Sequence, residues 1–148
     1  MAFEPRPYQT EAINASVDFF KSKKKFHGLN ILPTGSGKSV VIAEIARQLE
    51  GKTLIFQPSK EILEQNFSKF LSFGYRAGIY SASAGMKFID NVTFATIGSV
   101  NGKQHLFRQF TNIIIDECHL VNHEDGMYHD FIHAYDKVKV LGLTATPY

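Results

Sequence analysis

The sequence predicts an α/β fold in which a central, mostly parallel sheet carries helices on both faces. Short apolar segments with strand character alternate with longer segments whose apolar residues recur at helical spacing. Residues 111–115 are almost wholly apolar, as a strand buried on both faces should be. Strands separated by helices form parallel sheets with right-handed crossovers. Such sheets bind ligands beyond the carboxyl ends of their strands.

Four helices are expected, and each has a start or stop signal. Pro7 stands near the start of the first and lysines at its end, a glycine closes the second, and Ser59 can cap the third. The expected ranges are 7–26, 38–49, a helix from Ser59 to near Gly74, and 126–135. In each helix, residues at near-helical spacing are expected to group on one face. In the order of the helices, they are Tyr8, Ala12, Ile13, Ser16, Phe19 and Phe20; Val41, Ile42, Ile45, Ala46 and Leu49; Ile62, Leu63, Phe67, Phe70 and Leu71; and Met127, Tyr128, Phe131, Ile132 and Tyr135.

Six strands are expected between these helices. Their ranges are 28–32, 53–57, 76–81, 91–97, 111–115 and 138–145. Because a parallel sheet presents its ligand site at the carboxyl ends of strands, the chemistry is expected just after Leu32, Gln57, Ile97, Ile115 and Leu143.

Composition is that of one ordinary domain. The chain has 148 residues, of which 44% are hydrophobic, and 13 phenylalanines can supply a core. A single cysteine excludes an internal disulfide framework. The net charge of +2 is too small to indicate nucleic-acid binding by itself. With no apolar run of membrane-spanning length and no signal region, we expect a cytoplasmic protein without a membrane partner.

Residues 33–39 read Pro-Thr-Gly-Ser-Gly-Lys-Ser and join a predicted strand to a predicted helix. Gly35 and Gly37 let backbone N–H groups converge on a phosphate, and the helix N-terminus adds its dipole there. Lys38 supplies a charge for the β- and γ-phosphates and Ser39 a hydroxyl for Mg²⁺. Leu32 stands where the general phosphate-loop pattern has a glycine, but Gly35 still allows the tight turn. We expect ATP to be held here by Thr34, Gly35, Ser36, Gly37, Lys38 and Ser39.

Two adjacent carboxylates, Asp116 and Glu117, follow the apolar strand 111–115. Burying neighbouring acids is unfavourable unless a cation or a reaction needs them. A metal–phosphate site supplies that need. Asp116 is expected to hold Mg²⁺ together with Ser39, and Glu117 to orient and deprotonate an attacking water. Lys38, Asp116 and Glu117 are therefore the predicted catalytic residues.

Further segments extend these two motifs. They are Arg-Pro-Tyr-Gln at 6–9, Pro-Ser-Lys at 58–60, Ala-Thr-Ile-Gly-Ser at 95–99, Asp-Glu-Cys-His at 116–119 and Thr-Ala-Thr-Pro at 144–147. In this order the chain resembles the N-terminal RecA-like P-loop NTPase domain of superfamily 2 helicases, over nearly its whole length. The closest similarity is to RadD-like DNA repair helicases and the type III restriction motor subunit. Gly98 departs from the family, which often has Gln there, and this puts one nucleic-acid contact in doubt.

The resemblance implies roles for the remaining motif residues. It assigns adenine recognition to Gln9, with Arg6 and Tyr8 lining the base pocket. It assigns nucleic-acid contacts to Ser59, Lys60, Thr96 and Ser99. It assigns the coupling between phosphate state and domain closure to His119, Thr144 and Thr146. It implies a motor that acts on nucleic acid, with DNA favoured over RNA. It also places the arginine finger in a second RecA-like domain, absent from this chain. We therefore expect a monomeric domain, 1–148, that binds ATP and hydrolyses it slowly.

Other functions fit less of the sequence. A small-molecule kinase would share the loop around Lys38 but has no use for Glu117 as a base. An RNA helicase motor and an ATP-binding switch that opens no duplex remain alternatives. His119, His123, His129 and His133 include helical spacings that suit zinc, but Met127 stands where a metalloprotease motif needs its second histidine.

Overall fold

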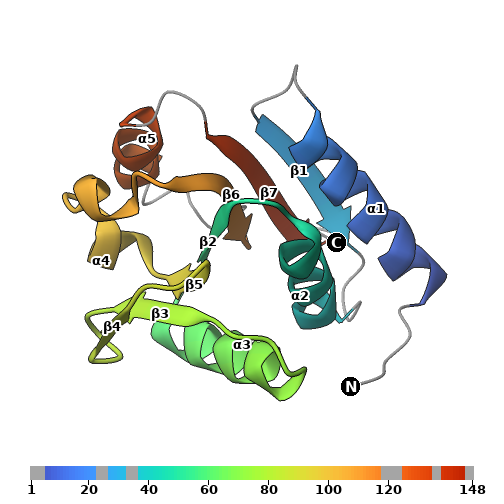
Figure 1. Cartoon of the computed structure of the whole chain (residues 1–148), viewed down its shortest axis with the longest axis horizontal. Coiled ribbons are helices and arrows are strands. Elements are labelled where there is room, and N and C mark those ends of the chain that lie inside the picture. The colour runs from blue at the N-terminus through green and yellow to red at the C-terminus, as the bar shows by residue number, and fades with distance from the viewer. Residues whose placement is uncertain (1–5, 23–26, 33–36, 118–124, 135–137, 146–148) are drawn as a thin grey trace.

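The computed structural model describes residues 6–22, 27–32, 37–117, 125–134 and 138–145, with side chains omitted for 27–32 and for three single positions. Its centre is a seven-stranded sheet of order β1-β7-β6-β2-β5-β3-β4 (Figure 1). All neighbouring strands run parallel except β3 and β4. The predicted α/β class, with a mostly parallel sheet, is confirmed.

Six of the seven strands occupy segments that the sequence predicts, with small shifts at their ends, and β4 is additional. Their bounds are β1 (His27–Leu32), β2 (Lys52–Phe56), β3 (Gly78–Ser81), β4 (Met86–Phe88), β5 (Val92–Ala95), β6 (Phe110–Asp116) and β7 (Lys139–Ala145). In the sheet β7 lies between β1 and β6, and β2 follows β6. Four strands distant in sequence therefore bring their carboxyl ends to one edge.

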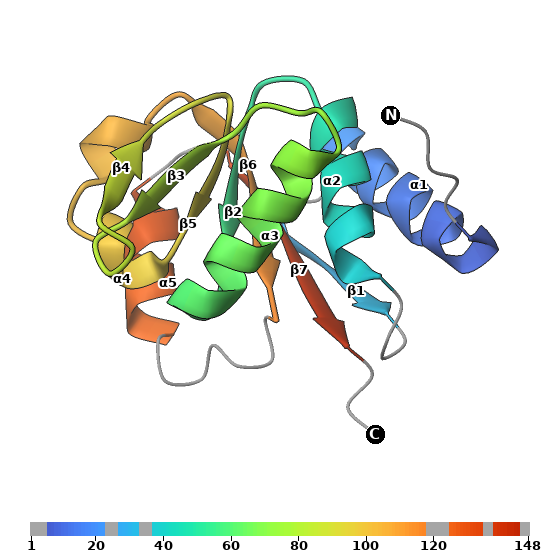
Figure 2. The ribbon, with the colours of Figure 1, turned by 90° about the horizontal axis from the view of Figure 1, so that it is seen from below.

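The helices form two layers around this sheet. They are α1 (Pro7–Lys21), α2 (Lys38–Gln48), α3 (Lys60–Ser72), α4 (Ile97–Val100) and α5 (Asp125–His133), with a 3-10 turn, η1, at Gln104–Phe107. Figures 1 and 2 show α1, α2 and α3 on one side of the sheet and α4 and α5 on the other. The connections β1–α2–β2 and β2–α3–β3 thus cross the same face.

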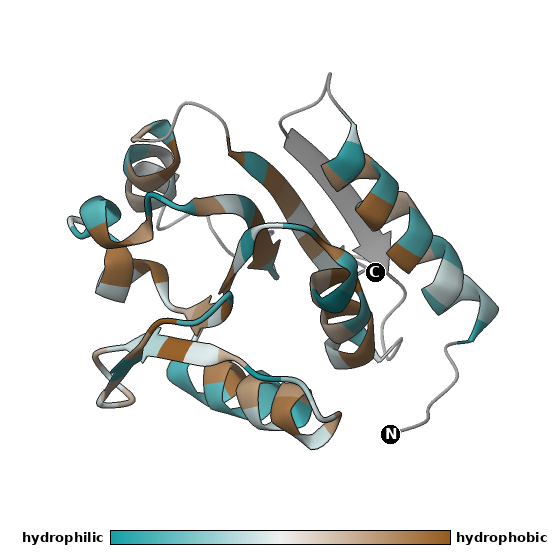
Figure 3. Cartoon of the chain, viewed as in Figure 1, coloured by the Kyte–Doolittle hydropathy of each residue, from teal (hydrophilic) through white to brown (hydrophobic). Residues whose placement is uncertain are grey.

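Alternate residues of the central strands pack in two separate hydrophobic cores. Ile55, Ile114 and Leu141 belong to the core beneath α1, α2 and α3, which we call the α1–α3 core. Their strand neighbours Phe56 and Ile113 belong to the α4–α5 core on the opposite face. This alternation is the period of a β-strand, and it explains why the central strands are apolar throughout. Figure 3 shows the apolar colouring concentrated on the strands and the inner sides of the helices.

The structure corrects several expectations. β4 and η1 were not predicted, and the expected strand 91–97 ends at Ala95, after which Ile97 begins α4. Leu71 was placed on the inner face of its helix, but it is 43% exposed, because α3 turns Leu63, Asn66 and Phe70 inward instead. Tyr135 lies outside the described residues. Among the helices described, none combines the length and apolar content needed to cross a membrane.

Candidate functional site

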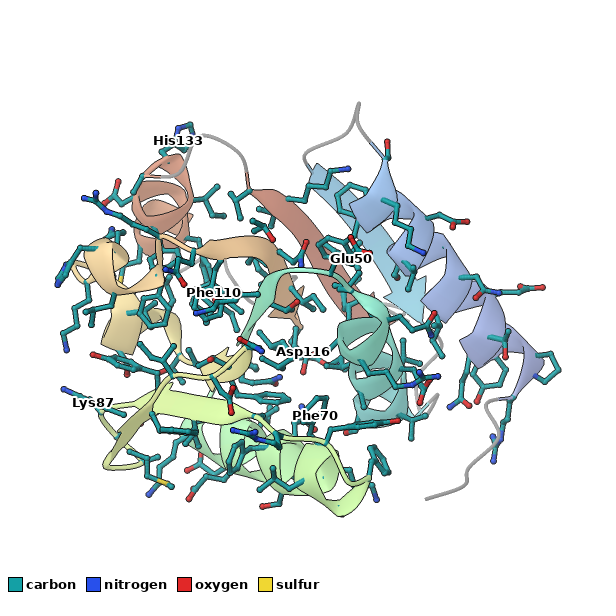
Figure 4. The ribbon with its side chains drawn as sticks, in the orientation of Figure 1. Glu50, Phe70, Lys87, Phe110, Asp116 and His133 are labelled. Atoms are coloured by element: carbon teal, nitrogen blue, oxygen red, sulfur yellow. The ribbon has the colours of Figure 1, made fainter. Side chains whose placement is uncertain are left out.

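Lys38 and the two predicted carboxylates meet at the carboxyl edge of the sheet. Lys38 is the first residue of α2, and Asp116 is the last residue of β6. The Lys38 Nζ atom lies 3.0 Å from Asp116 Oδ1 and also forms an ion pair with Glu117 Oε1. The Asp116 side chain is fully buried, while those of Lys38 and Glu117 keep about a fifth of their surface exposed. Asp116 lies in the middle of the molecule, beside α2 (Figure 4).

The backbone at Glu117 explains how two consecutive residues reach one ammonium group. Successive side chains of a strand point to opposite faces. Ile115 belongs to the α4–α5 core, so Asp116 points to the α2 side of the sheet. Glu117 has a φ of 55°, the left-handed region that side chains other than glycine rarely adopt. This turn ends the alternation and brings the second carboxylate to the same face.

Asn66 on α3 joins this cluster, although the sequence analysis did not single it out. Its Oδ1 accepts a hydrogen bond from Ser39 Oγ (2.7 Å). Its Nδ2 donates to Asp116 Oδ2 (3.3 Å) and to Gln57 Oε1 (3.0 Å), just beyond β2. The Gln57 Nε2 atom has no hydrogen-bond partner among the described residues. A polar residue at an inward position of an apolar helix face was the signal that could have revealed Asn66.

The segment before α2 is shaped by Gly37, its N-cap residue. Gly37 has a φ of 73°, and its carbonyl oxygen accepts from the backbone N–H groups of Val40 and Val41. A Cβ atom built there would stand 2.6 Å from Gln9 Nε2. The backbone conformation requires glycine. The close approach shows that the buried Gln9 side chain of α1 lies against Gly37 of the predicted phosphate loop.

The other two predicted base-pocket residues lie beside Gln9 at the start of α1. Arg6 is the N-cap, and its backbone N–H donates to Gln9 Oε1 (2.8 Å), as the N3 residue of a capping box accepts. The Arg6 Nη1 atom donates to the Tyr8 hydroxyl (3.3 Å). The three residues therefore form one cluster next to Gly37, with Gln9 buried and Arg6 exposed.

The predicted nucleic-acid contacts lie after β2 and β5. Ser59 is the N-cap of α3 and accepts from the backbone N–H of Ile62 (3.3 Å), so its capping role is shown; Lys60 beside it is exposed. Thr96 and Ser99 share a hydrogen bond between their hydroxyls (2.8 Å). Ser99 also accepts from the backbone N–H of Ala82 (2.9 Å), which ties α4 to the turn after β3.

Of the predicted coupling residues, Thr144 lies in the described part of the chain. It is buried in β7, where it pairs with Ile31 of β1, and its neighbour Leu143 pairs with Asp116 of β6. Thr144 thus lies in β7, between β1, which precedes the predicted phosphate loop, and β6, which ends at Asp116. The remaining predicted site residues lie outside the described part: Thr34, Gly35, Ser36, His119 and Thr146.

The donor set of this site fits magnesium. Mg²⁺ prefers oxygen ligands, and proteins bind it through one or two carboxylates together with substrate phosphates. Ser39 Oγ and both oxygens of Asp116 are connected through Asn66 and Lys38 in one cluster. Within the described ranges, no group of three or more histidine, cysteine, aspartate or glutamate residues is placed to hold a metal ion by itself.

Comparisons with known proteins agree with this architecture. The model of the family described as "Type III restriction enzyme, res subunit" matches residues 2–148. "DNA 3'-5' translocase XPB2" of Sulfurisphaera tokodaii is 32% identical over 148 residues, 97% of this chain and 31% of its own length. "Putative DNA 3'-5' helicase Rad25" of Halobacterium salinarum is 31% identical over 96% of this chain and 23% of its own length. The UvsW helicase of bacteriophage T4 superposes with a TM-score of 0.75 at 26% identity, covering 96% of this chain and 52% of that one.

Proposed function

The chain belongs to the family of the type III restriction enzyme res subunit, and from this premise we propose that it is the ATP-binding motor domain of a DNA translocase or helicase. Membership confirms the sequence-based identification with RecA-like domains of superfamily 2 helicases. The chain spans about a third or less of its two curated relatives named above, at 31% and 23% of their lengths. The activity of a whole protein that carries this domain is therefore part of the proposal.

The observation that carries the proposal is the convergence of Lys38, Asp116 and Glu117. An ammonium group at a helix N-terminus, beside two carboxylates, is suited to a phosphate–metal ligand. Lys38 would bind the β- and γ-phosphates of ATP, and Ser39 and Asp116 would hold Mg²⁺. When bound, Mg²⁺ neutralises charge on the phosphates. Glu117, partly exposed at the mouth of the site, would orient a water and accept its proton.

The base of the nucleotide would lie against the start of α1. Gln9 is buried beside Gly37, so it is the residue of α1 that lies against the segment entering α2. An amide can form paired hydrogen bonds with adenine. To do so, Gln9 Oε1 would release the backbone N–H of Arg6 and accept from the base instead. Arg6 and Tyr8 would flank the ring from the same helical turn.

The polynucleotide would run across the turns that follow β2 and β5. Lys60 is exposed and Ser59 half-buried at the first turn of α3, where a helix N-terminus favours a phosphate. Thr96 is half-buried, and Ser99 is buried and braces it. We favour DNA because the two curated relatives are named as a DNA translocase and a DNA helicase. Contacts of this kind are made to the backbone and carry no base specificity.

Nucleotide binding by the 148-residue chain tests the first part of the proposal. A fluorescent ATP analogue should bind in the presence of Mg²⁺, and Lys38→Ala should weaken binding at least about tenfold because charge-assisted phosphate contacts are lost. Glu117→Gln should retain binding and abolish turnover. Turnover by Glu117→Gln at the wild-type rate would contradict the role of Glu117 as the base.

A second experiment tests the motor and its polymer. We propose that a second RecA-like domain supplies an arginine finger, worth ~10³ or more in rate. This chain alone should hydrolyse ATP slowly, and a protein joining it to such a domain should be stimulated by DNA. Single-stranded DNA, duplex DNA and single-stranded RNA are compared. Stimulation by RNA alone would overturn the DNA preference, and binding without stimulation by any polymer would favour a nucleotide switch.

A further inference from the structure

Asn66 is a buried polar residue on an otherwise apolar helix face. It lies on α3 between the inward residues Leu63 and Phe70, and only 9% of its surface is exposed. Burying an amide is unfavourable unless its donors and acceptor are satisfied. An apolar side chain would serve packing better at this position. The presence of an asparagine at this position is therefore explained by its hydrogen bonds.

These hydrogen bonds fix the orientation of the amide. Both hydrogens of Nδ2 are used, one toward Gln57 Oε1 (3.0 Å) and one toward Asp116 Oδ2 (3.3 Å). The Oδ1 atom accepts from Ser39 Oγ (2.7 Å). A rotated amide would set its oxygen against Asp116 Oδ2, and a carboxylate oxygen can only accept. Asp116 therefore holds Asn66 with its oxygen toward Ser39, and Gln57 accepts the second hydrogen of Nδ2.

The orientation of the Asn66 amide determines which atoms of the Ser39 hydroxyl can bind a cation. A serine hydroxyl has one hydrogen and two lone pairs. Because Ser39 donates its hydrogen to Asn66, its lone pairs remain for a cation. On the other side, Asn66 holds Oδ2 of Asp116 while Oδ1 of the same carboxylate faces Lys38 Nζ at 3.0 Å. One amide thus orients both residues that would hold the metal.

We infer that Asn66 is a positioning residue for the magnesium site, acting through Ser39 and Asp116. The inference rests on the proposed function, because it assumes that these two side chains hold Mg²⁺. Outer-shell partners of metal ligands fix the orientation of those ligands, and removing them weakens metal affinity without removing a ligand. Asn66 should therefore influence the metal and leave metal-independent nucleotide contacts unchanged.

The test compares nucleotide affinity with and without the metal. Fluorescent ATP analogue is titrated into the 148-residue chain in EDTA and then at increasing Mg²⁺. The variants are Asn66→Ala, Asn66→Leu, which keeps the branching and the number of side-chain heavy atoms, and Gln65→Ala, an exposed neighbour on α3, as the control. Both Asn66 variants should raise the Mg²⁺ concentration for half-maximal enhancement about tenfold or more. Their affinity in EDTA should stay within about twofold of wild type, because Lys38 is untouched.

The outcomes separate this inference from the proposed function. An unchanged Mg²⁺ midpoint in both variants would overturn the positioning role while leaving the proposed function intact. Equal losses of affinity in EDTA and in Mg²⁺, or failure of both variants to fold, would show a purely structural role and overturn it too. If the wild-type chain binds the analogue no better with Mg²⁺ than in EDTA, the magnesium site itself is wrong, and the inference falls with it.

Discussion

Among individual residues, Glu117 combines two features that oppose folding. Its backbone has a φ of 55°, and left-handed conformations cost roughly 1–2 kcal/mol for residues with a side chain. Its carboxylate also shares one ammonium group, that of Lys38, with Asp116. Strain and like charges that persist together are typical of functional sites. The arrangement brings two acids to one face of the sheet, which an ordinary strand cannot do.

The backbone conformation of Glu117 predicts a difference in stability between two substitutions that both remove its carboxylate. Glu117→Gly relieves the backbone, offset by about 0.5–1 kcal/mol of extra entropy in the unfolded chain. Glu117→Gln removes the same charge and keeps the strain. Glu117→Gly should therefore be more stable than Glu117→Gln by roughly 0.5–1 kcal/mol, while neither turns over ATP. Urea unfolding of the two variants measures the difference. A Glu117→Gly variant less stable than Glu117→Gln by about 0.5–1 kcal/mol would mean that the turn stores no strain.

Most of the residues that meet at this site were predictable, and those that were missed share a physical cause. Lys38, Ser39, Asp116 and Glu117 lie in motifs whose spacing reflects phosphate chemistry, so their convergence follows from a parallel sheet. Asn66 lies in no such motif. It became visible only when α3 was packed against the sheet, because hydrogen bonds across 50 residues of sequence are set by tertiary structure.

Among the helices, α3 presents two functions at one end. Ser59 caps it by accepting from the backbone of Ile62, and the proposal gives the same residue a nucleic-acid contact. Two substitutions separate these roles. Ser59→Ala should lower the free energy of unfolding by about 1 kcal/mol. Ser59→Asp should keep the cap, since Asp is as good an N-cap, but repel a phosphate.

The measurement for Ser59 is DNA binding at low and high salt, beside urea unfolding. Ser59→Asp should retain wild-type stability and lose several-fold in DNA affinity, most strongly at low salt. Wild-type DNA affinity in Ser59→Asp would leave Ser59 with its capping role alone.

The junction between α2 and the segment before β3 gives a pH-dependent prediction. The Tyr75 hydroxyl donates to Glu44 Oε1 (3.2 Å), whose Oε2 accepts from Arg47 Nε (2.8 Å). Burial, with a smaller effect from the Glu44 charge, raises the pKa of Tyr75 above its ordinary 10.0. The folded state therefore holds the phenol proton more tightly than the unfolded state. This contribution to stability is fully present below pH 10.0 and is lost as the pH rises through the folded pKa.

Tyr75→Phe removes both the hydrogen bond and the titration. It should lower the free energy of unfolding by roughly 1–2 kcal/mol at neutral pH, because the acceptor is a buried carboxylate. The difference between the two proteins should shrink above about pH 10. Urea unfolding from neutral to alkaline pH measures it. A difference that stays constant across that range would assign the effect to packing.

The elements themselves were predictable where periodicity is strong and less so where segments are short. The three long helices and the central strands begin within a few residues of their predicted starts. β4 was missed because its three residues are all exposed, which leaves no apolar alternation to detect. The strand expected to reach Ile97 stops at Ala95 because the next residues turn into α4, whose apolar Ile97 and Val100 pack into the α4–α5 core.

For the molecule as a whole, the proposed nucleotide site lies on one face of the sheet. It draws on α1, α2 and α3. The other face holds a chain of aromatic rings centred on Phe107, which is fully buried. Its ring centroid lies 5.3 Å from that of Tyr80, 5.4 Å from that of Phe110 and 6.0 Å from that of Phe131. No residue proposed to bind the nucleotide belongs to this cluster.

Phe107→Ala should therefore weaken the fold without weakening the site. Removing a fully buried ring should lower the free energy of unfolding by roughly 3–5 kcal/mol. The matched control is Phe88→Ala on β4, where the ring is 55% exposed and the change should stay within about 0.5 kcal/mol. Below its unfolding transition, Phe107→Ala should bind the ATP analogue with wild-type affinity, because the sheet separates Phe107 from Lys38. A loss of affinity as large as the loss of stability would instead mean that the two faces are coupled through β6, whose Ile115 packs in the α4–α5 core and whose Asp116 pairs with Lys38.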